Sequence, residues 1–542
     1  MEEGFSYKGK TLLSRVDPAG KAERLADTVP VIDKTLYLCP SPLYGYGLER
    51  LLSRLGQSPN SAVLCIEPEP ELYDISREHF SEKLKHNRQL GLTNICDAAG
   101  LCAFIRKEWG SRVFRRVHVL RLNGGWQLFP DLNNLADTLQ REIALDWGNA
   151  MTLAKLGRRY IRNAIRNLPL IPKHPPVDAL SFDAEPVLTL GAGPSLDSAL
   201  DALESRFGES CHEQKTRPFR IVCVDTCLPA LRERGIRPDL AIILESQHWN
   251  LDDFTGLSGW DVPAAFDLSA LPRSAVVLAG GLYLFFTPWT QLNIFKRLGA
   301  VGLLPTNLPP LGSVGLSAAA ISMRLTQGVV ITAGIDFSFS MDAYHARSTP
   351  GHLARLRRQN RFSGLLNAGA AFGQSVFRAV SKTGSRVFSN PVMRNYRDLF
   401  EKQFAGSSPR LFDIAGSGLP LGVKTLSMEE AFSLLTDSGQ AINKENSASK
   451  RPGAEKLRCF TDEEIDRLLV LRGMLTGEVP MDYNSLANLI DECDYLWAHF
   501  PDYAASSRRP DKAELEAGSQ TVVSFLNRIR VEIDPFLKLW YN

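Results

Sequence analysis

The chain has 542 residues, a formal net charge of +2 and 44% hydrophobic residues. Its length exceeds what one hydrophobic core normally serves, so we expect two to four domains. The small net charge gives no reason to expect a nucleic acid or an acidic membrane as partner. No run of about twenty apolar residues predicts a membrane span, and the acidic N-terminus does not resemble a secretory signal. We expect a cytoplasmic protein whose nine scattered cysteines are reduced thiols.

Residues 1–150 are predicted to form a Rossmann-like α/β domain. The expected elements are the strand Leu36–Cys39, the glycine turn Tyr44–Gly47, the helix Leu48–Leu55 and the strand Ala62–Ile66. Glu67 follows the second strand, where such domains often hold a nucleoside or S-adenosylmethionine. The Tyr44–Gly47 turn fits the dinucleotide fingerprint poorly, however. A scaffold that binds no ligand is therefore the favoured interpretation.

Residues 151–425 are predicted to form a central domain that begins with a connecting helix over Asp146–Leu168. The proline-rich run Pro169–Pro176 marks a boundary after this helix. The expected strands are Val187–Leu190, Arg220–Val224, Leu240–Leu244, Ala275–Ala279 and Val329–Ala333. Helical patterns such as Leu228–Arg234 and Leu316–Leu325 separate them. This alternation predicts a mostly parallel sheet with helices on both faces.

Residues 426–542 are predicted to be a helical C-terminal region. The polar segment 438–456 has few apolar residues and is expected to be a linker or long loop. Helical patterns follow at Glu463–Leu471 and Val522–Ile533. Because this region carries no catalytic constellation, we expect it to serve packing or contact with a partner.

The glycine turn after Val187–Leu190 is the strongest candidate for a binding site. It contains Gly191, Ala192, Gly193, Pro194, Ser195 and Leu196, and Asp197 follows. A strand, a glycine turn and a helix start form a frequent phosphate site, because free N–H groups point at the ligand. Ser195 or Asp197 could instead cap these N–H groups.

Polar residues also follow the other expected strands of the central domain. They are Asp225 and Thr226, Glu245 and Gln247, Ser313 at a helix start, Asp336 after a Gly-Ile pair, and His345 in the next loop. Ligands of open α/β sheets bind outside the carboxyl ends of the strands. The sequence therefore predicts that these residues gather around one crevice.

In this order, these segments resemble the motility-associated factor family of bacterial flagellin glycosyltransferases. The shared features are Gly191–Asp197, Asp225, Gly235–Asp239, Gly334–Asp336, His345, and the run from Asn390 to Gly418–Leu421. The N-terminal Gly45–Gly47 and Ile66–Pro68 also resemble that family's first domain. The central segments are similar to CMP-sialic-acid-dependent sialyltransferases as well. The chain departs from these enzymes at Ser313-Val314-Gly315, and at Asp225, where they place an asparagine.

The resemblance implies that the central domain transfers a nonulosonic acid, of the pseudaminic or legionaminic type, from CMP to Ser or Thr of flagellin. His345 is then the expected base, Asp336 a second catalytic residue, and the nucleotide sugar contacts Gly191–Leu196, Asp225, Thr226, Glu245, Gln247 and Ser313. The CMP-sugar is a substrate, so no cofactor is required. No metal ligand is assigned, and the need for a divalent metal stays open, as does the oligomeric state.

Each candidate residue also has a structural alternative. His345 could be a solvated loop histidine, Asp336 could brace the glycine turn, and Glu245 could form an ion pair with an arginine. Asp239 is expected to belong to a turn rather than a site. The basic run Arg355–Arg361 could hold a sugar carboxylate, a phosphate or an acceptor protein, or be a solvated helix face. His248 and Trp249 could stack on a base or sugar, or be a packing pair.

Two other functions remain open. The central domain also resembles 6-hydroxymethylpterin diphosphokinase-like proteins, which implies ATP and Mg²⁺ held by Asp225, Glu245 or Asp336. A third possibility is a non-catalytic scaffold that binds flagellin, with the helical C-terminal region as its working part. Binding of CMP, of ATP with a pterin, or of neither ligand distinguishes the three.

Overall fold

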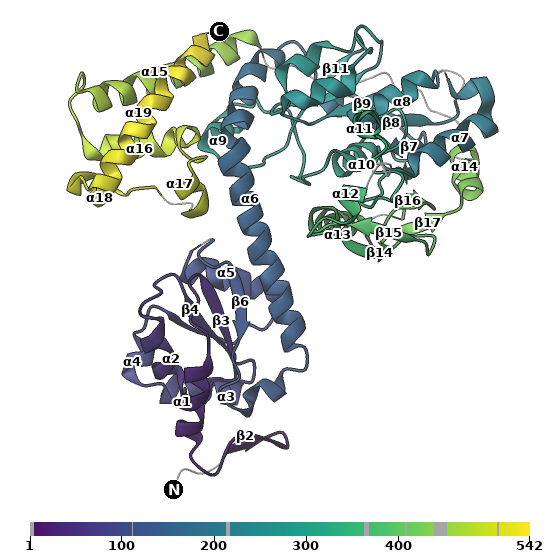
Figure 1. Ribbon diagram of the computed structural model, residues 1–542. Helices are drawn as coiled ribbons and strands as arrows, with labels where there is room; N and C mark the ends of the chain where they lie inside the picture. The colour runs from purple at the N-terminus through teal and green to yellow at the C-terminus, as the bar shows by residue number, and fades with distance from the viewer. Residues whose placement is uncertain are drawn as a thin grey trace. The chain divides into compact units, whose positions relative to one another are not determined.

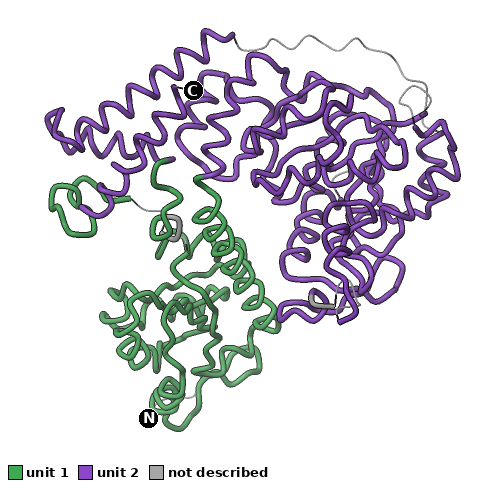
Figure 2. The backbone as a smooth tube through the Cα atoms, turned by 45° about the horizontal axis from the view of Figure 1, so that its top comes forward, with its two compact units in different colours: residues 1–158, 496–522 green, residues 159–495, 523–542 purple. Residues whose placement is uncertain are grey.

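The computed structural model describes residues 5–110, 112–212, 217–362, 368–406, 409–437, 453–506 and 509–541 (Figure 1). The chain divides into two compact units, coloured separately in Figure 2. Unit 1 contains residues 1–158 and 496–522, and unit 2 contains residues 159–495 and 523–542.

Unit 1 is built around a four-stranded parallel sheet. Its strands are β3 (Thr35–Pro40), β4 (Ala62–Ile66), β5 (Leu90–Thr93) and β6 (Arg116–Val119), in the order β5-β4-β3-β6. Both predicted strands and the predicted helix, α2 (Leu48–Leu55), are confirmed. Alternate residues of β3 enter separate cores on the two faces, with Tyr37 in one core and Leu36 in the other. The sheet is therefore covered on both faces, as parallel sheets require.

Helices and a hairpin complete unit 1. They are β1 (Phe5–Tyr7), β2 (Lys10–Leu13), α1 (Pro18–Thr28), α3 (Pro70–His79), α4 (Glu82–Lys85), α5 (Ala98–Glu108), α17 (Pro501–Ser506) and α18 (Lys512–Ala517). The connecting helix α6 runs over Leu132–Asn167, so it begins before the predicted Asp146. Its last residues belong to unit 2.

The carboxyl edge of the unit 1 sheet is filled by the protein itself. Ser41 follows β3 and Glu67 follows β4; both are fully buried, and the Ser41 hydroxyl donates to the Glu67 carboxylate. Gly125 packs so closely on Ser41 that an added Cβ would lie 2.7 Å from the Ser41 carbonyl oxygen. These contacts occupy the place where a Rossmann-like domain would hold its ligand.

Unit 2 contains a nine-stranded sheet in which every pairing is parallel. Its strands are β7 (Val187–Leu190), β8 (Arg220–Val224), β9 (Leu240–Ile243), β10 (Ala264–Asp267), β11 (Leu282–Phe286), β12 (Thr306–Asn307), β13 (Val330–Ala333), β16 (Leu411–Ile414) and β17 (Lys424–Leu426). Their order is β12-β11-β10-β9-β8-β7-β13-β16-β17. The predicted α/β fold with a mainly parallel central sheet is therefore confirmed.

One predicted strand of the central domain is wrong. Within Ala275–Ala279, the first two residues end a 3-10 helix that runs over Pro272–Val276, and no strand follows until β11. The Ser274 hydroxyl donates to the Leu271 carbonyl and holds this turn. Val276 is 74% exposed, so the apolar run does not mark a buried strand. The prediction missed β10 and β11, on either side of this turn, and also β12, β16 and β17.

The chain reverses its direction of winding between β7 and β13. From β7 it adds β8 to β12 on one side, and then returns to place β13 on the other side of β7. Helix α7 (Leu196–Phe207) leaves the carboxyl end of β7, and α10 (Val314–Leu325) packs on β7, β8, β9 and β13. The other helices are α8 (Leu228–Glu233), α9 (Asn293–Ala300), α11 (Pro350–Arg358), α12 (Ala368–Ala371), α13 (Pro391–Phe404) and α14 (Met428–Asp437), with the hairpin β14 (Phe377–Val380) and β15 (Arg386–Ser389).

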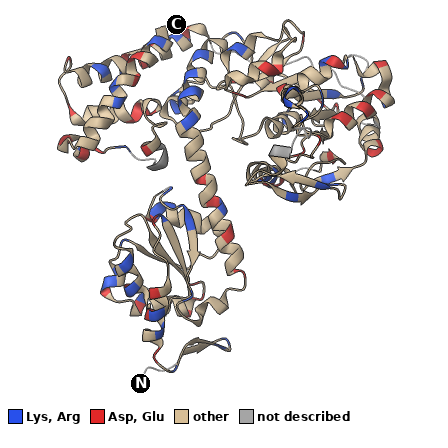
Figure 3. Cartoon of the chain, viewed as in Figure 1, with Lys and Arg blue, Asp and Glu red and all other residues tan. Residues whose placement is uncertain are grey.

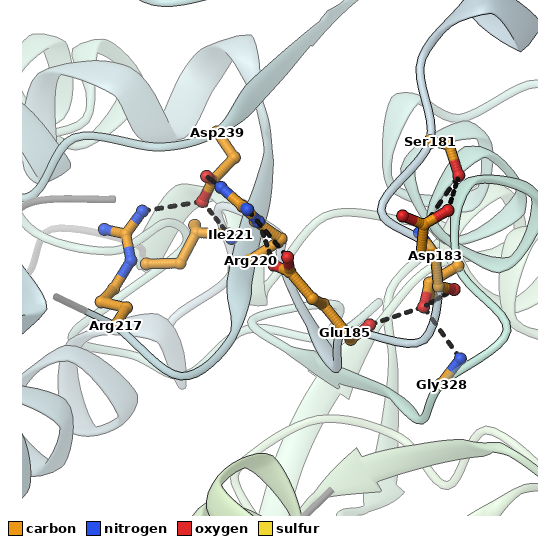
Figure 4. Close-up of polar contacts among 9 residues, drawn as sticks. Ser181, Asp183, Glu185, Arg217, Arg220, Ile221, Asp239 and Gly328 are labelled. Carbon is orange, nitrogen blue, oxygen red and sulfur yellow. Dashed lines mark hydrogen bonds and ion pairs between the residues drawn. The ribbon is translucent and has the colours of Figure 1, made fainter. Parts of the chain in front are cut away.

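An ion-pair network ties the strand starts together at the opposite, amino edge of the sheet (Figure 4). Asp239 accepts from the Arg217 guanidinium at 2.7 Å, from Arg220 at 3.1 Å and from the Ile221 N–H at 2.7 Å. Arg220 also pairs with Glu185. Asp239 is 4% exposed, so these partners offset the cost of burying its charge. It therefore has a structural role, as the sequence favoured.

The C-terminal helices of unit 2 are α15 (Ala454–Thr476), α16 (Tyr483–Glu492) and most of α19 (Gln520–Tyr541). Both predicted helical patterns lie within them. Arg297 of α9 forms an ion pair with the buried Glu464 at 2.7 Å, which fixes α15 to the central sheet's helices. Of the predicted linker, residues 438–452 lie outside the described residues. Among the helices of the described ranges, none has the length and apolar character that a bilayer span needs.

Candidate functional site

The glycine turn after β7 packs directly against the turn after β13. The Gly191 N–H donates to the Ala333 carbonyl, and the Gly193 N–H donates to the Gly334 carbonyl, both at 2.8 Å. A Cβ added to Gly191 would lie 2.5 Å from the Gly334 oxygen, and Gly334 has a positive φ of 72°. These positions require glycine because the two backbones touch, which explains both glycine motifs in the sequence.

Asp336 is the central polar group of this contact. Its carboxylate accepts from the Ser195 N–H at 2.7 Å and from the Ser195 hydroxyl at 2.5 Å. Only 2% of Asp336 is exposed, and Gly193 and Gly418 pack around its carboxyl group. Asp336 thus braces the start of α7 from the neighbouring strand. Neither Ser195 nor Asp197 caps α7 as the sequence suggested, because Asp197 accepts from the Arg347 N–H instead.

Most N–H groups of the predicted phosphate cradle are used inside the protein. Within Ala192–Leu196, Gly193 and Ser195 donate to Gly334 and Asp336, Leu196 donates to the Gly193 carbonyl, and Pro194 has no N–H. The Asp336 carboxylate thus lies where a phosphate oxygen would approach Ser195. A ligand phosphate at this turn is therefore left with Ala192 and the first turn of α7, unless it displaces Asp336.

The predicted base, His345, lies beside the glycine turn. The next residue, Ala346, donates its N–H to the Ala192 carbonyl at 3.0 Å. Burial, followed by the positive charge of Arg355, lowers the pKa of His345 to about 4. The Nδ1 atom of His345 has no hydrogen-bond partner in the described part of the chain. At neutral pH this ring is therefore uncharged and has a nitrogen able to accept a proton.

Asp225 belongs to a buried polar cluster at the end of β8. Its carboxylate accepts from the Thr226 N–H at 2.9 Å and from the Asn250 amide at 2.7 Å. Asn250 and Thr226 also donate to Asp253, each at 3.3 Å. Burial raises the pKa of both Asp225 and Asp253. The charge of Glu245 also raises the pKa of Asp225, and the charge of Asp225 raises that of Asp253, because like charges repel. Across the described residues, no group of three or more His, Cys, Asp and Glu side chains is placed to hold a metal ion.

Glu245 and Gln247 follow β9 at the same edge. Glu245 accepts from the Gln247 N–H at 2.9 Å, so the carboxylate shapes its own turn. Burial and then Glu245 raise the pKa of Tyr160 in α6 to about 12. Trp249 is 73% exposed, so the alternative in which it packs with His248 is wrong.

Ser313 is the N-cap residue of α10, and its hydroxyl makes no capping bond to the helix. Because α10 packs on β13 and precedes it, its N-terminus faces the same sheet edge as that of α7. Two helix N-termini therefore lie at the carboxyl edge, where the winding reverses. A helix N-terminus carries a partial positive charge and favours an anion.

A buried ion pair completes the site and was missed by the sequence analysis. Lys382 follows the β14 strand, and its ammonium lies 2.6 Å from the Asp413 carboxylate of β16. Both side chains are almost fully buried, and Gly418 packs on the Lys382 chain. Lys382 also donates to the Ile414 carbonyl at 3.1 Å. This pair anchors the long connection between β13 and β16 beneath the site.

The sequence analysis also missed Asn250, Asp253 and two asparagines of α6. Asn163 donates to the Ser246 and Ser269 carbonyls, and Asn167 donates to the Leu268 and Ala270 carbonyls. These amides hold the loops after β9 and β10. Their spacing of four residues on one helix face was the available signal.

Comparisons with known proteins agree with this architecture. Residues 162–342 match the family model of 6-hydroxymethylpterin diphosphokinase MptE-like proteins. An uncharacterized protein of Treponema pallidum (strain Nichols) is 28% identical over 570 residues, which cover 99% of this chain and 94% of that protein. The structure of MAf glycosyltransferase from Magnetospirillum magneticum AMB-1 superimposes with a TM-score of 0.52 at 14% identity. That match covers 99% of this chain and 89% of the other.

The family match covers the turn after β7, the cluster after β8 and the turn after β13. The structural match extends over both units and, at 14% identity, describes the fold. Residues 162–342 therefore resemble the MptE-like family, and the chain has the fold of the MAf glycosyltransferase from Magnetospirillum magneticum AMB-1.

Proposed function

We propose that the central domain is a glycosyltransferase that moves a nonulosonic acid from a CMP donor to Ser or Thr of flagellin, for flagellar assembly and motility. The observation that carries the proposal is the pair of helix N-termini, from α7 and α10, at the reversal between β7 and β13. An anionic ligand is favoured there. The fold, shared with a protein named as a glycosyltransferase, supports the reaction class.

The proposed reaction breaks the bond between the sugar's anomeric carbon and the phosphate oxygen of CMP, and CMP leaves with the electron pair. The acceptor hydroxyl forms the new bond to that carbon and gives up its proton. Because CMP leaves as a stable anion, the enzyme needs no strong acid. Its tasks are to hold the phosphate, to support positive charge on the sugar and to accept the hydroxyl proton.

His345 is the proposed acceptor of that proton. Its low pKa keeps the ring neutral across the physiological range, and its buried Nδ1 makes no hydrogen bond with the described residues. The Ala346–Ala192 hydrogen bond ties His345 to the turn at which the donor phosphate is proposed to bind. The proposed phosphate contacts are the Ala192 N–H, the first turn of α7, and Ser313 with the N-terminus of α10.

The variant His345→Gln tests the base. With donor and flagellin, we expect transfer to fall by about 100-fold or more, while donor binding measured by calorimetry stays within about twofold. His352→Gln is the matched control, because His352 lies on α11 and its Nδ1 is also buried without a partner. Equal rates for His345→Gln and the wild type would rule out this role.

A second function is favoured by one observation, the match to the diphosphokinase MptE-like family. That activity would use ATP and Mg²⁺. Asp225 and Asp253 offer paired carboxylate oxygens, the ligand type that Mg²⁺ prefers. Thr226 and Asn250 would hold the two carboxylates in place around the ion.

Calorimetry with the full chain separates the two functions. Binding of CMP without a requirement for Mg²⁺ supports sugar transfer, and intact-mass analysis of flagellin co-expressed with the chain and a nonulosonic-acid pathway then detects the added sugar. Binding of ATP and a pterin only with Mg²⁺, abolished in Asp225→Asn, supports the kinase. No binding of any of these ligands would contradict both functions.

A further inference from the structure

The connection between β13 and β16 has an extreme charge composition. From Ala343 to Arg397 the sequence contains ten Lys and Arg and no Asp or Glu, in a chain whose formal net charge is only +2. The basic residues are Arg347, Arg355, Arg357, Arg358, Arg361, Arg378, Lys382, Arg386, Arg394 and Arg397. Figure 3 shows Lys and Arg on this connection, including its β14–β15 hairpin.

Only part of this charge is neutralised within the protein. Lys382 pairs with Asp413, Arg397 pairs with Asp398 and Glu401, and Arg347 lies 3.9 Å from Asp197. By contrast, no carboxylate of the described residues forms an ion pair with Arg357, Arg358 or Arg361. All three of these arginines are exposed.

The unpaired arginines stand among exposed apolar side chains. Helix α11 buries none of its nine residues, and its Leu353 and Leu356 are 38% and 45% exposed. Phe362, just beyond the helix, is 85% exposed. We call Leu353, Leu356, Arg357, Arg358, Arg361 and Phe362 the α11 surface. Isolated exposed apolar residues are ordinary, but arginine and phenylalanine together are typical of protein interfaces.

The α11 surface lies next to the candidate catalytic site. An added Cβ at Gly351 would lie 2.7 Å from His345 Nδ1, so the first turn of α11 rests on the predicted base. The Arg355 guanidinium stacks on the Tyr344 ring, 4.1 Å from its centre. A partner bound to α11 would therefore reach the site at which the acceptor hydroxyl must react.

We propose that the α11 surface docks an acidic, apolar segment of the protein acceptor. This inference rests on the proposed glycosyltransferase function and adds to it the chemistry by which the acceptor is recognised. The unpaired guanidinium groups provide complementary charge for Asp and Glu side chains, and each can hold a carboxylate through two parallel hydrogen bonds. Leu353, Leu356 and Phe362 provide apolar contacts between them.

Two other anionic ligands fit this surface less well. A nucleotide-sized donor normally binds in a concave site that buries most of its area, whereas α11 buries none of its own residues. Single-stranded nucleic acid is bound by stacking its bases on aromatic rings. Here Phe362 is the only aromatic member of the surface, and the aliphatic leucines give bases no such partner.

The test uses the full chain and a fluorescent peptide of alternating Glu and Leu, with a Lys-Leu peptide and a single-stranded RNA as rival probes. We expect the wild type to bind the Glu-Leu peptide most tightly, and less tightly as salt is raised. Arg357→Glu with Arg358→Glu should weaken binding by ~10-fold, about 1.4 kcal/mol. Phe362→Ser, at a position too exposed to affect folding, should also weaken it.

The matched control is Arg206→Glu with Arg273→Glu. Arg206 lies in the last turn of α7, as Arg357 and Arg358 lie in the last turn of α11, and Arg206 and Arg273 are both exposed. This control variant changes the net charge by the same amount as Arg357→Glu with Arg358→Glu, and it should leave peptide binding unchanged. Equal weakening by both pairs, or RNA binding as tight as peptide binding, would overturn the proposal.

The same variants separate this proposal from the proposed function. With flagellin as acceptor, the α11 pair should raise the acceptor KM and leave release of CMP by donor hydrolysis unchanged. An unchanged acceptor KM overturns the docking proposal alone. If the wild type releases no CMP from the donor, the glycosyltransferase function fails, while the peptide experiment still decides whether α11 binds acidic segments.

Discussion

Replacing Asp336 tests how the candidate site is held together. Its carboxylate is 2% exposed and accepts two hydrogen bonds from Ser195, at 2.7 Å and 2.5 Å. A hydrogen bond to a charged group contributes about 1.5–3 kcal/mol. Asp336→Ala removes both and leaves the partly buried Ser195 N–H without a partner. We therefore expect it to lower the free energy of unfolding by about 3–5 kcal/mol.

Asp336→Asn should cost less, about 1–3 kcal/mol, because an amide oxygen still accepts from the Ser195 N–H. Ser195→Ala is the matched control: it removes only the hydroxyl bond and keeps the N–H bond to Asp336. The measurement is urea denaturation of the full chain, followed by tryptophan fluorescence. A loss for Asp336→Ala below about 1 kcal/mol would show that the carboxylate does not brace this turn.

The same variants decide whether Asp336 also takes part in the reaction. If it only braces the turn, donor turnover by Asp336→Asn should follow the folded fraction of the variant. If it acts on the substrate, turnover should fall by about 100-fold or more at temperatures where the variant is fully folded. The two outcomes differ by far more than the error of either assay.

Changes at Glu67, Lys382 and Gly418 test the packing around the two sheets, and a change at Gly148 provides a contrast. Burial raises the pKa of Glu67 to about 7 from an ordinary 4.5, so its stabilising effect is present below pH 4.5 and is lost as pH rises through 7. Glu67→Gln should therefore flatten the wild type's decline of up to about 3 kcal/mol between pH 4.5 and 8, measured by urea midpoints. Lys382→Met should lower the free energy of unfolding by about 3–5 kcal/mol, because it leaves the buried Asp413 carboxylate without its ion-pair partner. The double variant Lys382→Met with Asp413→Leu should recover most of this loss. Equal melting temperatures for Lys382→Met and the wild type would refute this reasoning. Gly418→Ala should cost about 1–3 kcal/mol, because its Cβ would lie 2.6 Å from Asp336, whereas Gly148→Ala, with open space around it, should stabilise α6 by up to about 1 kcal/mol.

The sequence was most informative where one physical cause dominates. Buried parallel strands leave continuous apolar runs, so β4, β7 and β8 were predicted at their observed bounds. The run Ala275–Ala279 is also apolar, but the strand predicted there is wrong, because Ser274 closes a 3-10 turn in which Val276 is exposed. Apolar content alone does not distinguish a strand from a turn whose hydrogen bonds are made locally.

The site was predictable in its position but not in its hydrogen bonds. Strand order cannot be read from one sequence, so bracing of the glycine turn by Asp336 was only one of two interpretations until the structure placed β13 beside β7. That pairing gives the Ser195 N–H to Asp336 rather than to a ligand. Lys382 carried no local signal either, because its partner Asp413 lies on a strand about thirty residues further along the chain.

Several acidic residues are buried in or near the strands of the central sheet, and their neighbours indicate their roles. Asp239 lies at the amino edge, paired with two arginines, and Asp413 is paired with a lysine, so both are structural. Asp225 and Asp253 share amide and hydroxyl donors, no Lys or Arg of the described residues forms an ion pair with either, and both have raised pKa values. Like-charged neighbours held together in this way cost stability, which a structural role alone would not favour. A ligand that supplies positive charge or a proton to this pair of carboxylates is therefore the simplest reason for its presence. Asp225→Asn removes one of the two negative charges. It should raise the melting temperature above pH 7 and weaken binding of that ligand.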